Sequence, residues 1–186
     1  LCGMLVSAYD QAVAKQGMFT FAISGGSMLK MLSYLDSDRM DFKRCVMAFV
    51  SHRCVAMDDD GATFHKARPM FLDAWMAQGL TVVKPTGSTD ASAEAEFYDS
   101  SLRGMVETED GVYPSFDRCL IGMGLDGHIG SIYPNIADVE SCRAVVPITG
   151  VDGMGQLSTK VSLSIASMKA SRASVVVCAG TSLKVP

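Results

Sequence analysis

The 186-residue sequence has few charged side chains and lacks the features that mark several large classes of protein. Charged residues make up 19% of the chain, and acidic residues outnumber basic ones to give a formal net charge of -4. No run of lysine or arginine reverses this balance locally, which argues against a nucleic-acid partner. No apolar run approaches the roughly 18 residues of a membrane span, and no signal segment opens the chain. We therefore expect a small-molecule partner, with no nucleic acid and no membrane.

The six cysteines show no C-x-x-C spacing. Cys45, Cys119 and Cys178 lie inside apolar runs, where free thiols serve as small core residues in proteins of a reducing compartment. We therefore expect a cytoplasmic protein. The P-loop and dinucleotide-binding glycine signatures are absent, and the acidic turn 58–61 lacks the alternating ligands of a calcium loop. No cofactor and no metal are expected.

The length suits a single domain with one continuous core, and apolar residues make up 48% of the chain. Leu1 falls inside an expected helix, and Pro186 follows an expected strand with no closing element. We therefore expect one domain over 1–186 that lacks its native N- and C-terminal elements.

Segments with apolar side chains at helical spacing alternate with short, continuous apolar runs. Such runs are typical of strands covered on both faces in a parallel sheet. The alternation predicts an α/β fold, a three-layer sandwich with a mostly parallel sheet and right-handed crossovers. Helices are expected over 5–16, from Ser27 onward, over 69–78 and after Thr89 or Asp90; strands are expected over 18–23, 45–50, 80–83, 119–121, 142–148, 160–165 and 174–178.

The stretch 116–134 carries the strongest signal for a site. An apolar segment ending at Ile121 runs into a glycine-rich turn that presents Asp126 and His128 after the strand has ended. Open α/β sheets bind ligands outside the carboxyl ends of their strands. Asp126 and His128 are therefore candidate site residues, although an aspartate in such a turn also commonly bonds its own backbone.

A second glycine turn, Ser24-Gly25-Gly26-Ser27, follows the expected strand 18–23. We expect Ser27 to cap the helix that begins there. Two glycines let the backbone approach an anion, and the N–H groups of the first helical turn favour negative charge. Phosphate is the expected ligand; the alternative is a tight turn that any strand-to-helix connection requires.

Cations also follow or begin other strands. Arg53 comes after strand 45–50 on the expected ligand edge, with a surface cation as the alternative, and Lys160 opens a later strand toward either ligand or water. We expect His52 to be an exposed loop residue and Trp75 a core residue. The helix after Asp90 carries an acidic face that we expect to be solvated: Glu94, Glu96 and Asp99.

Three segments together resemble one family. The sequence GMGLDGHIGSIYP resembles the GMGxDGHxxSLFP signature of 6-phosphogluconolactonases, and FAISGGS resembles the LSGGST turn that precedes it. AFVSHRCV is similar to the strand that this family follows with Asp-Glu-Arg-x-Val. The resemblance implies a Rossmann-like sandwich. The sequence departs from the pattern where Ser51 and His52 replace Asp and Glu, where Met28 replaces Thr and where Lys160 replaces Arg.

The resemblance implies hydrolysis of 6-phospho-D-glucono-1,5-lactone to 6-phosphogluconate in the oxidative pentose phosphate pathway. In this reading His128 is the general base, Asp126 orients the imidazole or a substrate hydroxyl, and Arg53 stabilises the oxyanion or holds the phosphate. The chain is then a monomer or one part of a fused dehydrogenase–lactonase. The other residues expected to bind the substrate and its phosphate are Ser24, Gly25, Gly26, Ser27, Gly124, Gly127, Lys160 and Lys184.

Two alternatives stay open. The related glucosamine-6-phosphate isomerase/deaminase branch follows its DGH with Phe-Asn-Glu-Pro, whose Glu assists ring opening. The corresponding segment here, 131–134, contains no carboxylate, which favours the lactonase. The second alternative is a weakly catalytic module that binds a sugar phosphate, which the replaced Asp-Glu pair suggests.

Overall fold

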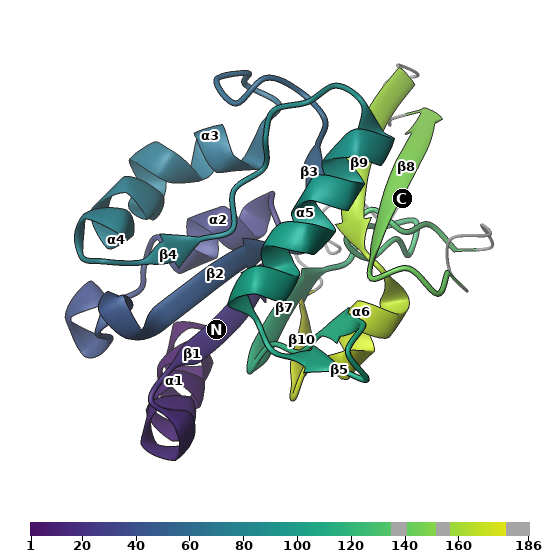
Figure 1. Ribbon diagram of the computed structural model, residues 1–186. Coiled ribbons are helices and arrows are strands. Elements are labelled where there is room, and N and C mark those ends of the chain that lie inside the picture. The colour runs from purple at the N-terminus through teal and green to yellow at the C-terminus, as the bar shows by residue number, and fades with distance from the viewer. Residues whose placement is uncertain (135–140, 152–156, 178–186) are drawn as a thin grey trace.

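The computed structural model of the chain describes residues 1–134, 141–151 and 157–177 (Figure 1). The predicted alternation of helices and strands is confirmed over these residues. The helical elements are α1 (Cys2–Gln16), α2 (Ser27–Leu32), η1 (Ser37–Arg39), η2 (Phe42–Arg44), α3 (Thr63–Ala67), η3 (Arg68–Leu72), α4 (Asp73–Ala77), α5 (Ala91–Met105) and α6 (Ile165–Ala170). The strands are β1 (Phe19–Ile23), β2 (Cys45–Phe49), β3 (Ser51–Arg53), β4 (Thr81–Val82), β5 (Thr108–Glu109), β6 (Tyr113–Pro114), β7 (Arg118–Gly122), β8 (Val145–Val151), β9 (Leu157–Leu163) and β10 (Ser174–Val177).

A five-stranded sheet of order β10-β7-β1-β2-β4 forms the centre of the structure, and all of its pairings are parallel. This arrangement confirms the predicted α/β sandwich with a mostly parallel sheet. Because parallel strands place their carboxyl ends at the same edge, the turns after β1, β2 and β7 meet there. These turns begin at Ser24, Val50 and Met123.

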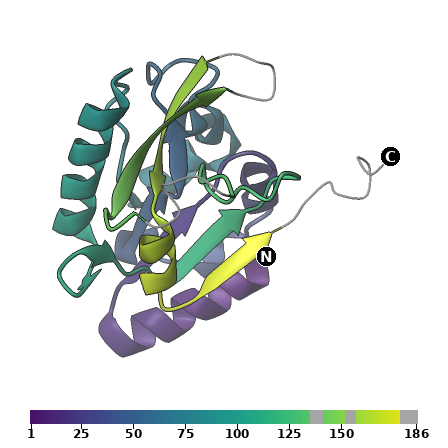
Figure 2. The same cartoon turned by 90° about the vertical axis from the view of Figure 1, so that its right-hand side faces the viewer.

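A second sheet, of order β3-β9-β8, is antiparallel and lies beside α5, as Figure 2 shows. The expectation that residues 51–53 form a loop after β2 is therefore wrong. Ser51, His52 and Arg53 continue as strand β3 and pair with Ser162, Val161 and Lys160 of β9. The hydrogen bonds between strands distant in the sequence, which no local pattern reveals, convert this segment from a loop into a strand.

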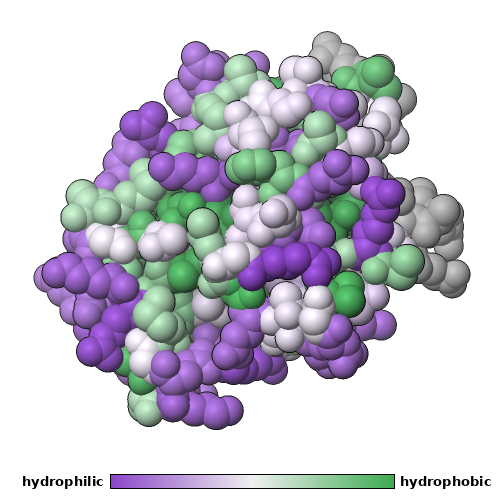
Figure 3. Space-filling model, in the orientation of Figure 1, coloured by the Kyte–Doolittle hydropathy of each residue, from purple (hydrophilic) through white to green (hydrophobic). Residues whose placement is uncertain are grey.

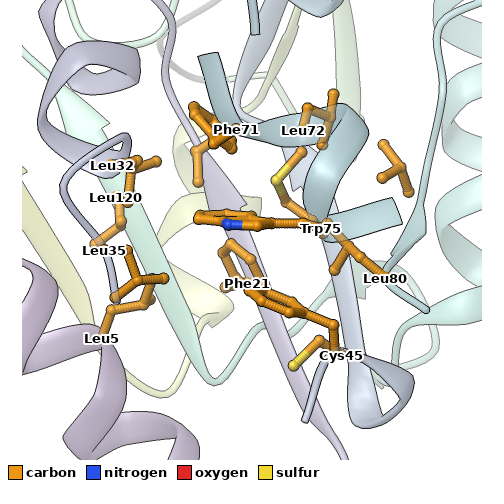
Figure 4. Close-up of a cluster of buried hydrophobic side chains, with 14 of the residues drawn as sticks. Leu5, Phe21, Leu32, Leu35, Cys45, Phe71, Leu72, Trp75, Leu80 and Leu120 are labelled. Carbon is orange, nitrogen blue, oxygen red and sulfur yellow. The ribbon is translucent and has the colours of Figure 1, made fainter. Parts of the chain in front are cut away.

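The side chains of the central strands alternate between two hydrophobic clusters. On one face Phe19, Phe21 and Ile23 of β1 pack with α1, α2 and the α3–α4 segment. Trp75 lies in this cluster (Figure 4) and is 2% exposed, as predicted for a core residue. It stacks on Phe42 with ring centroids 4.9 Å apart. This packing fixes the helices that border one side of the ligand edge.

On the other face Ala22 of β1 and Ala48 of β2 pack against α5, β8, β9 and α6. The Tyr98 hydroxyl of α5 accepts a hydrogen bond from the backbone N–H of Phe49 at 2.6 Å and donates one to its carbonyl at 3.1 Å. Asp90 caps α5 by accepting hydrogen bonds from the N–H groups of Ser92 and Ala93, which confirms the predicted helix start. The helix is thereby attached to the end of β2.

Two predicted helix starts are wrong. The N-cap of α2 is Gly26, at φ 65°, and Ser27 is the first helical residue, because the turn needs a backbone conformation that glycine adopts most easily. The helix expected from Pro69 begins six residues earlier, at Thr63, and Pro69 lies within the π-helix η3. Proline removes one backbone donor inside a helix, and the wider π-turn accommodates this loss.

The buried cysteines behave as predicted for core thiols. Burial raises the pKa of Cys45 and that of Cys119 to about 12, so both thiols stay protonated at neutral pH. Cys178 lies outside the described residues. On the face seen in Figure 3, hydrophilic residues lie mainly around the margin, and hydrophobic areas lie between them.

Candidate functional site

A cavity of about 640 Å³ opens at the carboxyl edge of the central sheet. This volume lies within the range of pockets that hold small metabolites. The cavity is bordered by the glycine turn after β1, by β3 and β9, and by α3 and η3. Its lining includes Ser24, Gly25, Gly26, Ser51, Arg53, Thr63, His65, Lys66, Gly122, Gly130, Ser131 and Lys160.

The glycine turn presents its backbone to this cavity. The Ser24 hydroxyl accepts the N–H of Gly122 at 2.9 Å, which ties the turn after β1 to the turn after β7. A side chain at Gly25 would approach Thr63 of α3 to 3.1 Å, so the turn and α3 are close neighbours. Ser24, Gly25 and Gly26 therefore line the cavity, whereas Ser27 is exposed and lies outside its lining.

Two cations face the same cavity from adjacent strands. Arg53 of β3 lies directly opposite Lys160 of β9 in the antiparallel register. Like charges placed opposite one another in a sheet repel, and an anion bound between them would relieve that repulsion. The register thus brings together two residues that are more than one hundred positions apart in the sequence.

The segment after β7 forms two small nested turns. Isolated bridges join Met123 to Ile129 and Ile129 to Ile132. The N–H of Gly124 donates to the His128 carbonyl at 2.8 Å, which closes the first turn around Asp126. Gly124 and Gly127 do not line the cavity; Gly127 adopts φ 82°, so its role in this structure is conformational.

Asp126 and His128 form a hydrogen-bonded pair, with 2.6 Å between Oδ1 of the carboxylate and Nδ1 of the imidazole. Because an ionised carboxylate only accepts hydrogen bonds, this contact assigns the imidazole proton to Nδ1 and leaves the lone pair of neutral histidine on Nε2. Desolvation raises the pKa of Asp126, but the hydrogen bonds from the ring and backbone N–H of His128 outweigh it and lower the pKa. Asp126 therefore stays ionised beside His128.

His128 adjoins the cavity without lining it. Gly130, two residues along the chain, does line the cavity, so the Cα atoms of the two residues are at most about 7 Å apart. The Tyr133 ring connects the pair to the cationic strand, since its centroid lies 5.0 Å from that of the His128 ring and 5.7 Å from Lys160 Nζ. The sequence analysis did not single out Tyr133 as a residue that contacts His128.

His52 and Glu94 are buried against each other, which corrects two predictions. His52 is 4% exposed and Glu94 is 1% exposed, and 3.1 Å separates His52 Nε2 from Glu94 Oε1. Side chains alternate along a strand, so residue 52 faces α5 while Arg53 faces the cavity. The His52 side chain thus bonds Glu94, while the residue itself also borders the cavity.

Glu94 accepts further hydrogen bonds, from the backbone N–H and hydroxyl of Thr86 and from the N–H of Ser88. Burial raises the pKa of Glu94, yet the hydrogen bonds from His52 and Thr86 lower it to about 2. The expectation of a solvated acidic face therefore fails at Glu94, because the first turns of α5 pack against β3. Glu96, two residues later, is exposed as predicted.

The α3 wall of the cavity, formed by Thr63, His65 and Lys66, was missed by the sequence analysis. The helix was expected to begin at Pro69, so the preceding residues were left as loop. The buried residues Phe64, Ala67, Phe71 and Trp75 recur at helical spacing and could have revealed the earlier start.

Three further expectations concern Lys184, a metal ion and a membrane span. Lys184 lies outside the described residues. Within residues 1–134, 141–151 and 157–177, no group of three or more His, Cys, Asp or Glu side chains could hold a metal ion. Among the helices of these same ranges, none has the length and apolar character needed to cross a membrane.

Known proteins resemble the chain in both sequence and fold. Residues 1–184 match the family described as glucosamine-6-phosphate isomerases/6-phosphogluconolactonase. A 6-phosphogluconolactonase of Synechocystis is 26% identical over 155 residues, which cover 82% of this chain and 65% of that protein. The chloroplastic 6-phosphogluconolactonase 3 of Arabidopsis thaliana is 31% identical over 135 residues, 67% of this chain and 42% of that protein. The chain thus spans less than two thirds of the length of these two relatives.

Solved structures confirm the fold. The 6-phosphogluconolactonase of Trypanosoma brucei superposes with a TM-score of 0.77 at 20% identity, covering 95% of this chain and 75% of that one. The Thermotoga maritima 6-phosphogluconolactonase gives a TM-score of 0.79 at 16% identity, covering 94% of this chain and 76% of that one. From the family match over 1–184, we conclude that the chain belongs to the glucosamine-6-phosphate isomerase/6-phosphogluconolactonase family.

Proposed function

We propose that this chain hydrolyses 6-phospho-D-glucono-1,5-lactone to 6-phosphogluconate. Membership of the family and the names of the relatives in Synechocystis and Arabidopsis thaliana support the substrate class. The cavity adds the glycine turn of Gly25 and Gly26 and the cations Arg53 and Lys160.

His128 acts as the general base. Its Nε2 takes a proton from a water molecule as that water attacks the C1 carbonyl carbon of the lactone. Asp126 holds the ring in the required tautomer and stabilises the imidazolium that forms. When the tetrahedral intermediate collapses, the C1–O5 bond breaks and the imidazolium returns the proton to the departing O5, which becomes the C5 hydroxyl.

Arg53 and Lys160 bind the negatively charged groups of the substrate. Arg53 stabilises the oxyanion at C1 or, like Lys160, holds the phosphate; both face the cavity. The backbone N–H groups of Gly25 and Gly26 donate hydrogen bonds to the phosphate oxygens. The lactone ring extends from the cavity past Gly130 toward His128.

The observation that carries the proposal is the 2.6 Å contact between Asp126 and His128 beside a cavity whose lining includes Arg53, Lys66 and Lys160. A histidine with its Nδ1 engaged by a carboxylate has Nε2 available for a water molecule. The pair can therefore act as a general base through Nε2 of His128. The positive charge of the cavity lining suits an anionic substrate.

We expect His128→Asn to lower kcat for 6-phosphogluconolactone by about 10²- to 10⁴-fold, because a general base contributes about that much to a rate. The rate of enzymatic hydrolysis is obtained by subtracting the rate at which the lactone hydrolyses spontaneously. Leu125→Ala serves as the control, since Leu125 belongs to the same loop and is 58% exposed. An unchanged kcat in His128→Asn would contradict the role assigned to this residue.

A second assay separates the two branches of the family. Glucosamine 6-phosphate is offered to the wild-type protein, and ammonia release is measured beside lactone hydrolysis. Release of ammonia without lactonase activity would replace the proposed reaction by the isomerase/deaminase reaction. Binding of 6-phosphogluconate with neither activity would indicate a sugar-phosphate binding module.

A further inference from the structure

One aromatic ring contacts both chemically important parts of the site. Tyr133 packs on His128 with 5.0 Å between ring centroids and an interplanar angle of 41°. Lys160 Nζ lies over the face of the same ring, 5.7 Å from its centroid. A single side chain thus contacts the candidate base and a candidate anion-binding cation, which come from different elements.

The neighbours of Tyr133 hold its backbone in place. Ile132, which precedes it, is 2% exposed and pairs with Ile129 in an isolated bridge. Pro134, which follows it, lies beside Gly127, where an added Cβ would be 3.3 Å from the proline Cγ. The ring is therefore carried by a segment that is anchored at Ile132 and passes close to the turn at Gly127, and it can restrain the groups that touch it.

The ring also gives Lys160 a favourable partner on a strand where the opposite residue carries a like charge. The register of β3 and β9 places Lys160 opposite Arg53. The face of an aromatic ring carries partial negative charge and attracts an ammonium group. The contact with Tyr133 thus sets the direction of the Lys160 side chain within a site that contains two cations.

We propose that Tyr133 is a positioning residue that holds the Lys160 ammonium and the His128 imidazole in one arrangement through its ring. The base and the cation then share one support, so that a loss of the ring disturbs both. The phenol hydroxyl is not needed for this role. The inference rests on the proposed function for its kinetic test and stands independently in its spectroscopic test.

The kinetic test compares Tyr133→Phe, which keeps the ring, with Tyr133→Leu, which removes it. We expect Tyr133→Phe to retain the wild-type kcat/KM for 6-phosphogluconolactone, and Tyr133→Leu to lower it about 5- to 10-fold, since two ring contacts of modest strength are lost. Lys160→Met is then introduced into the wild type and into Tyr133→Leu. Its effect should be about 2- to 5-fold smaller in Tyr133→Leu than in the wild type, because the two side chains interact.

The spectroscopic test uses the proton resonances of the histidine rings, of which the chain has only three. The resonance of His128 is assigned by its loss in His128→Asn. Tyr133→Leu removes a neighbouring aromatic ring and should shift this resonance, whereas Tyr133→Phe should leave it nearly in place. The resonances of His52 and His65 report whether the fold is intact.

The outcomes are distinct. A shifted His128 resonance together with lower kcat/KM only in Tyr133→Leu supports the inference. It is overturned if the His128 resonance does not move in Tyr133→Leu, if kcat/KM is unchanged in that variant, or if Tyr133→Phe loses as much activity as Tyr133→Leu. If the wild type hydrolyses no lactone, the proposed function fails, and the resonance of His128 alone decides the inference.

Discussion

Gly124 is the residue on which the placement of the Asp126–His128 pair depends most directly. An added Cβ at this position would lie 2.2 Å from Cε1 of His128 and 2.7 Å from Oδ1 of Asp126. Both distances are shorter than non-bonded atoms allow. The imidazole and the carboxylate close over the glycine, so the glycine serves the pair by having no side chain.

We expect Gly124→Ala to lower lactonase activity by about 10²-fold, which is comparable to the loss of a general base, because the new methyl group displaces the imidazole. The thermal midpoint should change little, since Asp126 is exposed and His128 is only half-buried. Activity and melting temperature are measured on the same preparation.

The matched control is Gly104→Ala. Gly104 lies in α5, and an added Cβ there would meet no atom within 4 Å. This variant should keep full activity and gain about 0.5–1 kcal/mol of stability, as alanine is the better helix former. Equal activity in Gly124→Ala and Gly104→Ala would show that the His128 ring need not hold its position over residue 124.

At the scale of elements, α5 and β3 are joined by the buried His52–Glu94 contact. The pKa of Glu94 is about 2 in the folded protein, below its ordinary value of 4.5. A carboxyl group whose pKa is lowered by folding stabilises the protein above pH 4.5 and loses this contribution as the pH falls from 4.5 toward 2. Acid should therefore loosen the attachment of the site strand to α5.

We expect Glu94→Gln to lower the free energy of unfolding at pH 7 by about 3 kcal/mol, because each unit by which folding lowers a pKa is worth about 1.4 kcal/mol. The fall in stability between pH 4.5 and 2 should also become shallower. Denaturant unfolding across this pH range measures both effects.

Glu96→Gln is the control for this experiment, because Glu96 belongs to the same helix and is exposed. Its stability and its pH dependence should match the wild type within about 0.5 kcal/mol. If the free energy of unfolding fell equally between pH 4.5 and 2 in Glu94→Gln and in the wild type, folding would not lower the pKa of Glu94.

The elements differ in how far local sequence determined them. The strand-glycine-helix order around Ser24 and the turn after Ile121 were predicted because their signals lie within a few residues. The pairing of β3 with β9 joins Arg53 to Lys160, and the contact of His52 with Glu94 spans 42 positions. Long-range pairing decided both, so the buried His52 and the strand at 51–53 could not be read from local patterns.

At the scale of the whole molecule, the two ends of the central sheet have different roles, one in the candidate site and the other in stability. The carboxyl ends of β1 and β7 carry the candidate site. At their amino ends the buried Asp117 accepts hydrogen bonds from the Thr20 N–H at 2.8 Å and from Gln16 Nε2 at 3.0 Å. Arg172, just before β10, also pairs with Asp117. The sequence analysis overlooked this cluster, because its members come from four separate segments.

Asp117→Asn should destabilise the whole protein without changing its chemistry. Replacing the charged partner in a buried network costs about 3 kcal/mol, which corresponds to a fall of roughly 10 °C in Tm for a chain of this size. Well below the new Tm, kcat/KM for the lactone should equal that of the wild type, because the cluster lies at the end of the sheet away from the cavity. Asp10→Asn, at an exposed position of α1, should leave both Tm and kcat/KM unchanged. A selective loss of activity in Asp117→Asn, with Tm preserved, would show that the amino end of the sheet also shapes the site.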